Sequence, residues 1–165
     1  MAIAQNLVTN QTLTLIDLSG NPLKSPGLKL ICEGLRGNFT LKTLIVNQIG
    51  ACSEGAYTIA DLLMEPSSQL IELHLANNLI SPVGLNSIYQ ALAITNKRLK
   101  YIDVSGNFVS IDTLHALRCM VEKNISLNYL VVSDIYKWHS TALSALAESF
   151  QFNKSLKEVN LKTCS

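Results

Sequence analysis

The chain has 165 residues, which suits a single domain of ordinary size. Hydrophobic residues make up 48% of it and charged residues 15%, so there is ample apolar surface to offset chain entropy, and the composition argues against a disordered protein. Thirteen Lys and Arg residues nearly balance twelve Asp and Glu residues, and the sequence contains no run of about 18 apolar residues. We therefore expect no nucleic-acid partner and no membrane partner.

The first six residues lack the basic start and the apolar core of a secretory signal. No two of the four cysteines form a Cys-x-x-Cys pair, which favours reduced thiols over disulfides. Both observations predict a cytoplasmic location. The cysteines are Cys32, Cys52, Cys119 and Cys164.

Residues 3–10 predict a short helix with Ile3, Ala4 and Leu7 on its inner face. This segment matches the helical part of the units that follow, but no strand precedes it. We expect it to belong to a partial repeat that covers residues 1–12.

Six segments after this helix share the frame LxxLxL, with apolar substitutions only. Each segment predicts a short strand that starts near its first leucine. Successive first leucines lie 28 or 29 residues apart, and we number the repeats one to six in chain order. These leucines are Leu13, Leu41, Leu70, Leu99, Leu127 and Leu156.

Three asparagines fall eight residues after the strand leucine, where the chain leaves the strand: Asn21, Asn78 and Asn107. A buried asparagine there can hydrogen-bond backbone groups of the tight turn, which otherwise would lose their partners. In the other repeats this position is held by Ile49, Ile135 and Cys164.

Apolar residues at spacings of three and four predict a helix with one buried face between each pair of strands. A serine marks each predicted helix start, where its hydroxyl can cap the free amides of the first turn. These serines are Ser25, Ser53, Ser81, Ser110 and Ser140.

Three residues before most strand leucines stands an asparagine, which predicts the left-handed backbone that ends many helices. This position holds Asn10, Asn38, Ser67, Asn96, Asn124 and Asn153.

Each repeat is thus a strand, a turn, a helix and a return loop, and stacked units bury an apolar stripe that one unit cannot bury alone. We predict a single domain over residues 1–165: a right-handed α/β solenoid with a parallel sheet on the concave face and helices on the convex face. The period and the LxxLxLxxN frame resemble leucine-rich repeats of the ribonuclease-inhibitor type. The resemblance covers essentially the whole chain and implies a curved protein-binding surface without naming a partner.

The third, fifth and seventh residues of each frame are expected on the concave face, because strand side chains alternate. Among them, Asp17, Glu72 and Asp103 form an acidic row, which favours a partner with basic and apolar features. Aromatic side chains among polar ones are frequent anchors of protein interfaces. The predicted partner-binding patch consists of His74, Tyr101, Asp103, Tyr129 and Val131, with Tyr136 and Trp138 at its rim. The alternative is an ordinary solvated sheet face.

The loop after the fifth strand is longer than the others and contains the only tryptophan. Two interpretations of this loop stay open. Tyr136 and Trp138 can anchor an interface, or Trp138 can fold back over the core near Ile135.

The sequence does not favour catalysis. His74 is expected near Glu72 and Asp103, a pairing that suits acid–base chemistry, but no nucleophile accompanies it. No set of Cys and His residues has the spacing of metal ligands, so we expect no metal and no cofactor. The predicted function is a non-enzymatic module that binds another protein.

Two further functions compete with this prediction. An architectural subunit would assemble through its open solenoid ends, where Leu156, Val159 and Leu161 are expected to face outward, and self-association is possible there. The ends fit either a fragment or a member of a larger assembly. A regulator of a small GTPase is disfavoured, because the first three strand exits carry no arginine. The basic cluster Lys97, Arg98 and Lys100 is interpreted as a solvated rim.

Overall fold

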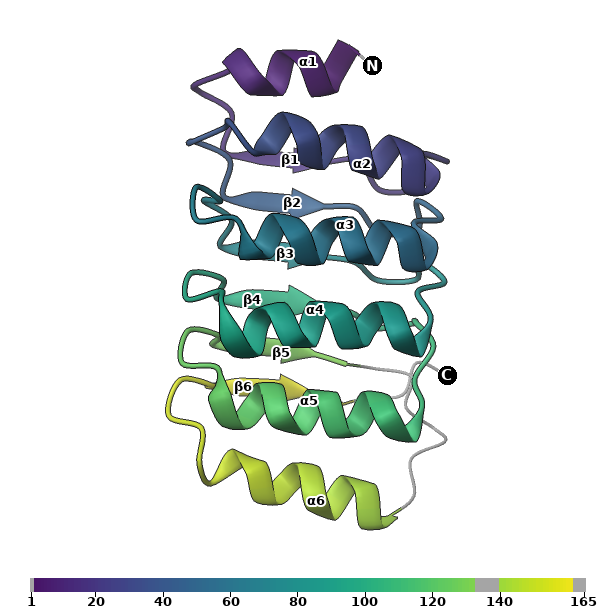
Figure 1. Cartoon of the computed structure of the whole chain (residues 1–165), viewed down its shortest axis with the longest axis vertical. Helices are drawn as coiled ribbons and strands as arrows, with labels where there is room; N and C mark the ends of the chain where they lie inside the picture. The colour runs from purple at the N-terminus through teal and green to yellow at the C-terminus, as the bar shows by residue number, and fades with distance from the viewer. Residues whose placement is uncertain (1, 133–139, 162–165) are drawn as a thin grey trace.

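The computed structural model describes residues 2–132 and 140–161, in which six short strands form one parallel sheet. The strands lie in chain order from β1 to β6, and a layer of helices covers one face of the sheet (Figure 1). The predicted α/β solenoid is therefore confirmed. The strands are β1 (Leu15–Asp17), β2 (Thr43–Ile45), β3 (Glu72–His74), β4 (Tyr101–Asp103), β5 (Tyr129–Val131) and β6 (Glu158–Asn160). The helices are α1 (Ala2–Thr9), α2 (Lys24–Leu35), α3 (Cys52–Met64), α4 (Pro82–Ile94), α5 (Ile111–Lys123) and α6 (Ser140–Phe150).

Every strand consists of the third to fifth residue of its frame, so the sheet is in register from end to end. The middle residue of each strand points toward the helices. In β2 to β5 these residues are at most 1% exposed and form the centre of the core. They are Leu44, Leu73, Ile102 and Leu130. The first and third strand residues point to the other face, as the alternation predicts.

The helices pack on the sheet through the predicted apolar faces. Leu28, Ile59, Ile88 and Leu117, one from each of α2 to α5, are fully buried. The terminal helices bury less, because each has a neighbouring helix on one side only: Ile3 in α1 is 49% exposed.

The predicted serine caps are confirmed in two repeats and wrong in two others. Ser81 and Ser110 lie eleven residues after their strand leucines and cap α4 and α5; Ser110 forms a reciprocal capping box with Thr113. Ser25 and Ser53 lie twelve residues after their leucines, one position further on, and cap nothing.

The two serines that do not cap a helix bond to the next repeat instead. The Ser25 hydroxyl donates to the Ala51 carbonyl, and the Ser53 hydroxyl donates to the Ser81 hydroxyl over 2.6 Å. These serines therefore link neighbouring coils at the helix starts.

The asparagines before the strands act through their side chains, and the prediction of a left-handed backbone is wrong. None of those that the structure describes has a positive φ. The Asn96 Nδ2 group donates to the Leu63 carbonyl over 3.0 Å, one coil earlier, and its Oδ1 accepts from the Arg98 and Leu99 amides at 3.1 and 2.9 Å. Each such asparagine ties the end of one helix to the next return loop. The same arrangement recurs at Asn38, Asn124 and Asn153.

The asparagines at the strand exits bond as predicted, and Asn78 and Asn107 also reach the preceding coil. Asn78 is fully buried, and its Nδ2 group donates to the Val46 carbonyl at 2.7 Å and the Leu75 carbonyl at 3.1 Å. Its Oδ1 accepts from the Ile49 and Ala51 amides at 3.0 and 3.3 Å. The exit of repeat two, which has Ile49 at the equivalent position, is thus held by an asparagine of repeat three.

The two ends of the described solenoid differ in their apolar exposure. Near α1 and β1, Leu13 and Leu15 are 38% and 50% exposed. At the other end, Leu156, Val159 and Leu161 are half-buried and pack against the core, so they do not face outward as predicted.

Candidate functional site

The sheet face away from the helices carries two parallel rows of side chains, and we call it the open sheet face. Neighbouring members of a row come from paired strands, so their positions follow directly from the register. The first row is Leu15, Thr43, Glu72, Tyr101, Tyr129 and Glu158. The second row is Asp17, Ile45, His74, Asp103, Val131 and Asn160.

Three rings from neighbouring strands form a cluster on this face. The His74 and Tyr101 ring centroids are 4.6 Å apart, and those of Tyr101 and Tyr129 are 6.4 Å apart. Both pairs are tilted, at interplanar angles of 30° and 37°, within the range in which aromatic rings attract each other. Tyr129 is 40% exposed, so the cluster offers an apolar surface to solvent.

Carboxylates surround this cluster, but they do not form the single row that the sequence predicted. Glu72 belongs to the first row, whereas Asp17 and Asp103 belong to the second. A fourth carboxylate, Glu158, pairs in register with Tyr129 and was left out of the predicted row. Its frame position equals that of Glu72, so the repeat alignment could have identified it.

Hydrogen bonds hold two of these carboxylates. The Ser105 hydroxyl and amide both donate to Asp103 Oδ1, at 2.6 and 2.9 Å. Asp17 accepts from the Ser19 amide at 2.9 Å. The Ser19 amide, followed by the Ser19 hydroxyl, lowers the pKa of the Asp17 carboxyl, because hydrogen bonds favour its charged form.

The surroundings of Tyr101, at the centre of the cluster, raise the pKa of its hydroxyl. Partial burial raises the pKa of the Tyr101 hydroxyl, and the nearby carboxylates of Asp103, Glu72 and Glu158 raise it further. Both rows together carry four carboxylates and no lysine or arginine among the residues described. The open sheet face is therefore negatively charged around an aromatic centre.

Comparison with known proteins identifies the repeat. The sequence model of the family described as "Leucine Rich repeat" matches residues 9–32. The chain is 32% identical over 127 residues to "NACHT, LRR and PYD domains-containing protein 3" from Bos taurus. It is 32% identical over 126 residues to "NACHT, LRR and PYD domains-containing protein 7" from Homo sapiens. Each match covers 76% of this chain but only 12% and 13% of those relatives, so the chain spans a small part of their length.

Two solved structures share the fold over most of their length. One is titled "Leiomodin-1 Actin-Binding Site 2 (ABS2)", with a TM-score of 0.76 and 16% identity over 91% of this chain and 86% of that one. The chain is a leucine-rich repeat protein. The tropomodulin C-terminal domain from Caenorhabditis elegans superimposes on this leucine-rich repeat protein with a TM-score of 0.73 and 12% identity, over 91% of this chain and 92% of that one.

The leucine-rich repeat fold brings five of the seven predicted patch residues together. They are His74, Tyr101, Asp103, Tyr129 and Val131, on three adjacent strands. The other two, Tyr136 and Trp138, lie outside the described residues, as does Ile135.

Among the residues that the structure covers, no group of three or more His, Cys, Asp and Glu side chains lies close enough to hold a metal ion. Cys32, Cys52 and Cys119 are free thiols, and burial raises the pKa of the Cys32 thiol to about 12, which keeps it protonated and unreactive. Within residues 2–132 and 140–161, no helix has the length and apolar character needed to cross a bilayer.

Proposed function

We propose that this leucine-rich repeat protein is a non-enzymatic module that binds another protein on its open sheet face. The observation that carries the proposal is the ring cluster of His74, Tyr101 and Tyr129, which lies on adjacent strands and is surrounded by carboxylates. Asp103 and Val131 complete the patch, and they pair in register beside the cluster.

The strands make this patch rigid, which favours binding. Backbone ladders fix the spacing of the rings, so little conformational entropy is lost when a partner docks. Partly exposed aromatic side chains are frequent energetic anchors of interfaces. The surrounding carboxylates attract a partner that offers basic groups next to an apolar side chain.

We extend the proposal to the rim of the patch and to the location of the protein in the cell. We assign Tyr136 and Trp138 to the rim of the binding surface, because they follow the fifth strand, where the chain leaves the sheet. Free thiols in the described chain and its similarity to NACHT and LRR domain proteins support a cytoplasmic protein whose 165 residues act as one repeat domain.

Two other functions have weaker support. An architectural subunit would use the exposed apolar side chains near the first strand, Ile3, Leu13 and Leu15. A regulator of a small GTPase is disfavoured, because no arginine occurs in the strand exits over 18–23, 46–51, 75–80 and 104–109. The leiomodin-1 structure is that of an actin-binding site, so actin is one defined protein to test against the open sheet face.

The test is affinity capture from cell extract, quantified by mass spectrometry, with actin co-sedimentation as a separate measurement. The variant Tyr101→Ala/Tyr129→Ala is expected to lose the captured partner at least tenfold, while its thermal midpoint changes little, because both side chains project away from the core. The control is Tyr57→Ala on α3, where the tyrosine is 41% exposed, nearly the same as Tyr129 at 40%. Tyr57→Ala should capture the partner normally.

Two outcomes would count against the proposal. If the double variant captures the partner as well as the wild-type chain does, the open sheet face is the wrong surface. If light scattering shows oligomers that dissociate in Leu13→Ser/Leu15→Ser but not in the tyrosine variant, the architectural function replaces it.

A further inference from the structure

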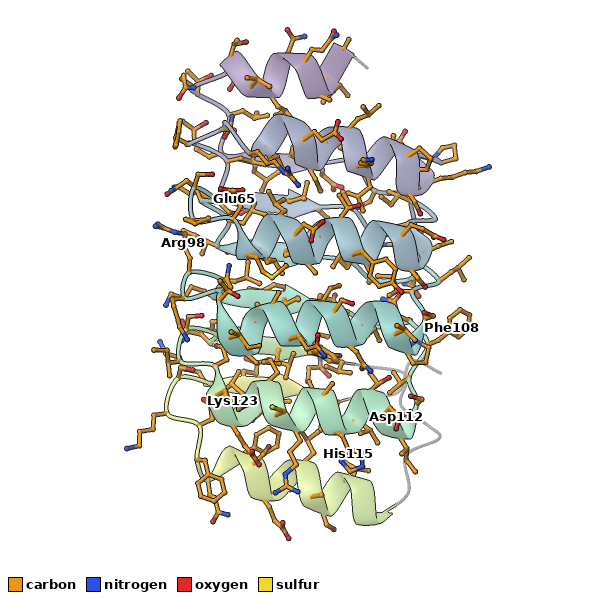
Figure 2. All side chains as sticks on the ribbon, viewed as in Figure 1. Glu65, Arg98, Phe108, Asp112, His115 and Lys123 are labelled. Carbon is orange, nitrogen blue, oxygen red and sulfur yellow. The ribbon has the colours of Figure 1, made fainter. Side chains whose placement is uncertain are left out.

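Most of the positive charge of the chain lies along one edge of the solenoid, where helices end and the chain returns to the next strand. We call this edge, from each last helical residue to the residue before the next strand, the strand-entry edge. It contains eight of the thirteen basic residues and one acidic residue, Glu65. The eight are Arg36, Lys42, Lys97, Arg98, Lys100, Lys123, Lys154 and Lys157. Figure 2 shows Arg98 and Lys123 on this edge and Asp112 on the opposite one.

The cations at the centre of this edge are not neutralised by carboxylates of the described chain. Gln69 Oε1 accepts from Lys42 Nζ at 3.3 Å and from Arg98 Nη1 at 3.2 Å, so an uncharged amide sits between two cations from different repeats. Within the described residues, the one ion pair is that of Arg118 and Glu122 on α5. The positive charge around Gln69 is therefore available to a partner.

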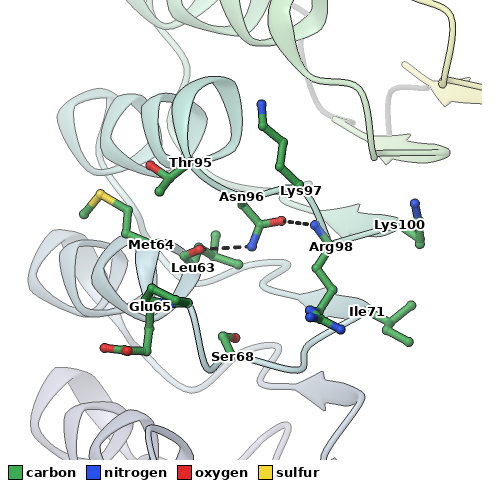
Figure 3. A pocket seen from close by; sticks show the side chains of 11 residues that line it. Leu63, Met64, Glu65, Ser68, Ile71, Thr95, Asn96, Lys97, Arg98 and Lys100 are labelled. Atoms are coloured by element: carbon green, nitrogen blue, oxygen red, sulfur yellow. Dashed lines mark hydrogen bonds between the residues drawn. The ribbon is translucent and has the colours of Figure 1, made fainter.

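These cations are also not needed as helix caps. Asn96 bonds the Leu63 carbonyl at the end of α3 and holds the Arg98 amide, as the dashed lines in Figure 3 show. The helix end thus has its hydrogen-bond partner without a lysine or arginine side chain. Lys97, Arg98 and Lys100 are all exposed.

A groove of about 600 Å³ opens between these cations and the end of α3. Its lining is mixed, and it contains one carboxylate, Glu65, against the three cations Lys97, Arg98 and Lys100, so positive charge is in excess. Leu63, Met64 and Ile71 supply apolar surface, and Lys97 and Arg98 supply charge (Figure 3). The size lies within the range of sites that bind small ligands or short peptide segments.

We propose that this groove binds an extended acidic segment of a protein, with a carboxylate next to Arg98 and an apolar side chain on Met64 and Ile71. Charge complementarity selects the acidic segment, and the apolar lining selects a peptide over a simple anion. No aromatic residue lines the groove within the described chain, so the stacking platform of a single-stranded nucleic-acid site is missing. The groove does not depend on the open sheet face, whose charge has the opposite sign.

The experiment measures binding by fluorescence anisotropy, with the full chain titrated into a labelled synthetic peptide of Asp, Glu and Leu. A peptide with Asn and Gln in place of the acids is the probe control. We expect the acidic peptide to bind, to bind at least tenfold more weakly to Arg98→Gln/Lys100→Gln, and to weaken as salt rises. The matched control, Lys24→Gln/Lys29→Gln, removes two exposed charges elsewhere and should bind like the wild-type chain.

A second variant removes the site without removing a cation. Gln69→Glu places a carboxylate between Lys42 and Arg98, where it competes with the carboxylate of the peptide. It should weaken binding while unfolding at the same or a higher temperature than the wild-type chain.

Three results would overturn the proposal. They are equal binding by the wild-type chain and Arg98→Gln/Lys100→Gln, full binding by Gln69→Glu, and equal binding of the acidic and the uncharged peptide. Phosphatidylserine vesicles test the alternative that this edge binds a membrane surface. If they bind in a manner sensitive to Arg98→Gln/Lys100→Gln while the peptide does not bind, the edge contacts membranes instead.

Discussion

The strand exits of repeats one and two differ from those of repeats three and four, although all four follow one frame. In the later pair, Ser81 and Ser110 occupy the position eleven residues after the strand leucine and cap the helix. In the earlier pair the same position holds Lys24 and Cys52, both with left-handed backbone, at φ 55° and 49°. A shift of one residue in the serine thus changes a helix cap into a link between coils.

The exit asparagines show the same asymmetry. Asn107 bonds within its own turn and also holds the Asn78 and Ile80 amides of the coil before it. Asn21 is exposed, and its amide donates only to Leu18 and Ser19 of its own turn among the bonds described. The benefit of an exit asparagine therefore goes partly to its predecessor, which explains why repeat two tolerates Ile49 in this position.

The largest effect is expected from Asn78→Ala. The substitution leaves several buried backbone groups of two coils without partners, which should lower the free energy of unfolding by roughly 2–4 kcal/mol. Asn21→Ala, at the exposed equivalent position, should lower it by less than about 1 kcal/mol. Urea unfolding measures both. Equal losses would show that the asparagine does not act across coils.

A smaller difference is expected between two exit glycines, which share one frame position with positive φ. Gly20 has φ 71° and open space around it, so Gly20→Ala should cost about 1 kcal/mol of backbone strain. At Gly106, φ 64°, an added Cβ would also meet Oδ1 of the exposed Asn77 side chain, which must turn away, so Gly106→Ala should cost slightly more. Thermal unfolding of the two variants compares them, and equal midpoints would contradict the close packing at Gly106.

Substitutions at the position eleven residues after the strand leucine are expected to change the free energy of unfolding in opposite directions in repeats two and three. Cys52→Gly relieves left-handed strain and should raise the free energy of unfolding by about 0.5–1 kcal/mol. Ser81→Ala removes the cap of α4 and should lower it by about 1 kcal/mol. Chemical denaturation decides, and a loss of stability in both variants would mean that the left-handed residue contributes contacts of its own.

The smallest effect concerns two thiols of the first repeats, and its contribution to stability changes only at high pH. Because burial raises the pKa of Cys32 to about 12, the stability contributed by its protonated form is complete below the unfolded-state pKa and is lost as pH rises toward 12. At pH 8 the native chain should therefore leave Cys32 unmodified by a thiol reagent, whereas the half-buried Cys52 reacts. Comparison of reaction time courses for the wild-type chain and Cys32→Ala tests this. A fast phase lost in Cys32→Ala would refute it.

The repeat frame predicted the fold well, because period, alternation and helical spacing are properties of local sequence. It also placed His74, Tyr101 and Tyr129 on one face, since parallel register carries equal frame positions into one row. The frame did not predict the bonds between coils. Whether a serine caps its own helix or bonds to the next coil depends on its position, eleven or twelve residues after the strand leucine, and the sequence pattern treated both positions as caps.

The charge pattern was only partly predictable for a related reason. The cluster Lys97, Arg98 and Lys100 was visible in the sequence, but its significance depends on what lies next to it in the neighbouring repeats. Gln69, 29 residues before Arg98, shares its frame position and places an amide there. Such contacts combine residues one period apart, and they become visible when the repeats are aligned as a stack.

The central claim is that a protein partner docks on the open sheet face, and hydrogen–deuterium exchange with the captured partner tests it most directly. We predict slower exchange in the segments around β3, β4 and β5, with no change in the helices α2 to α4 on the opposite face. Protection confined to those helices, or to residues 2–18 at the end of the solenoid, would contradict the claim.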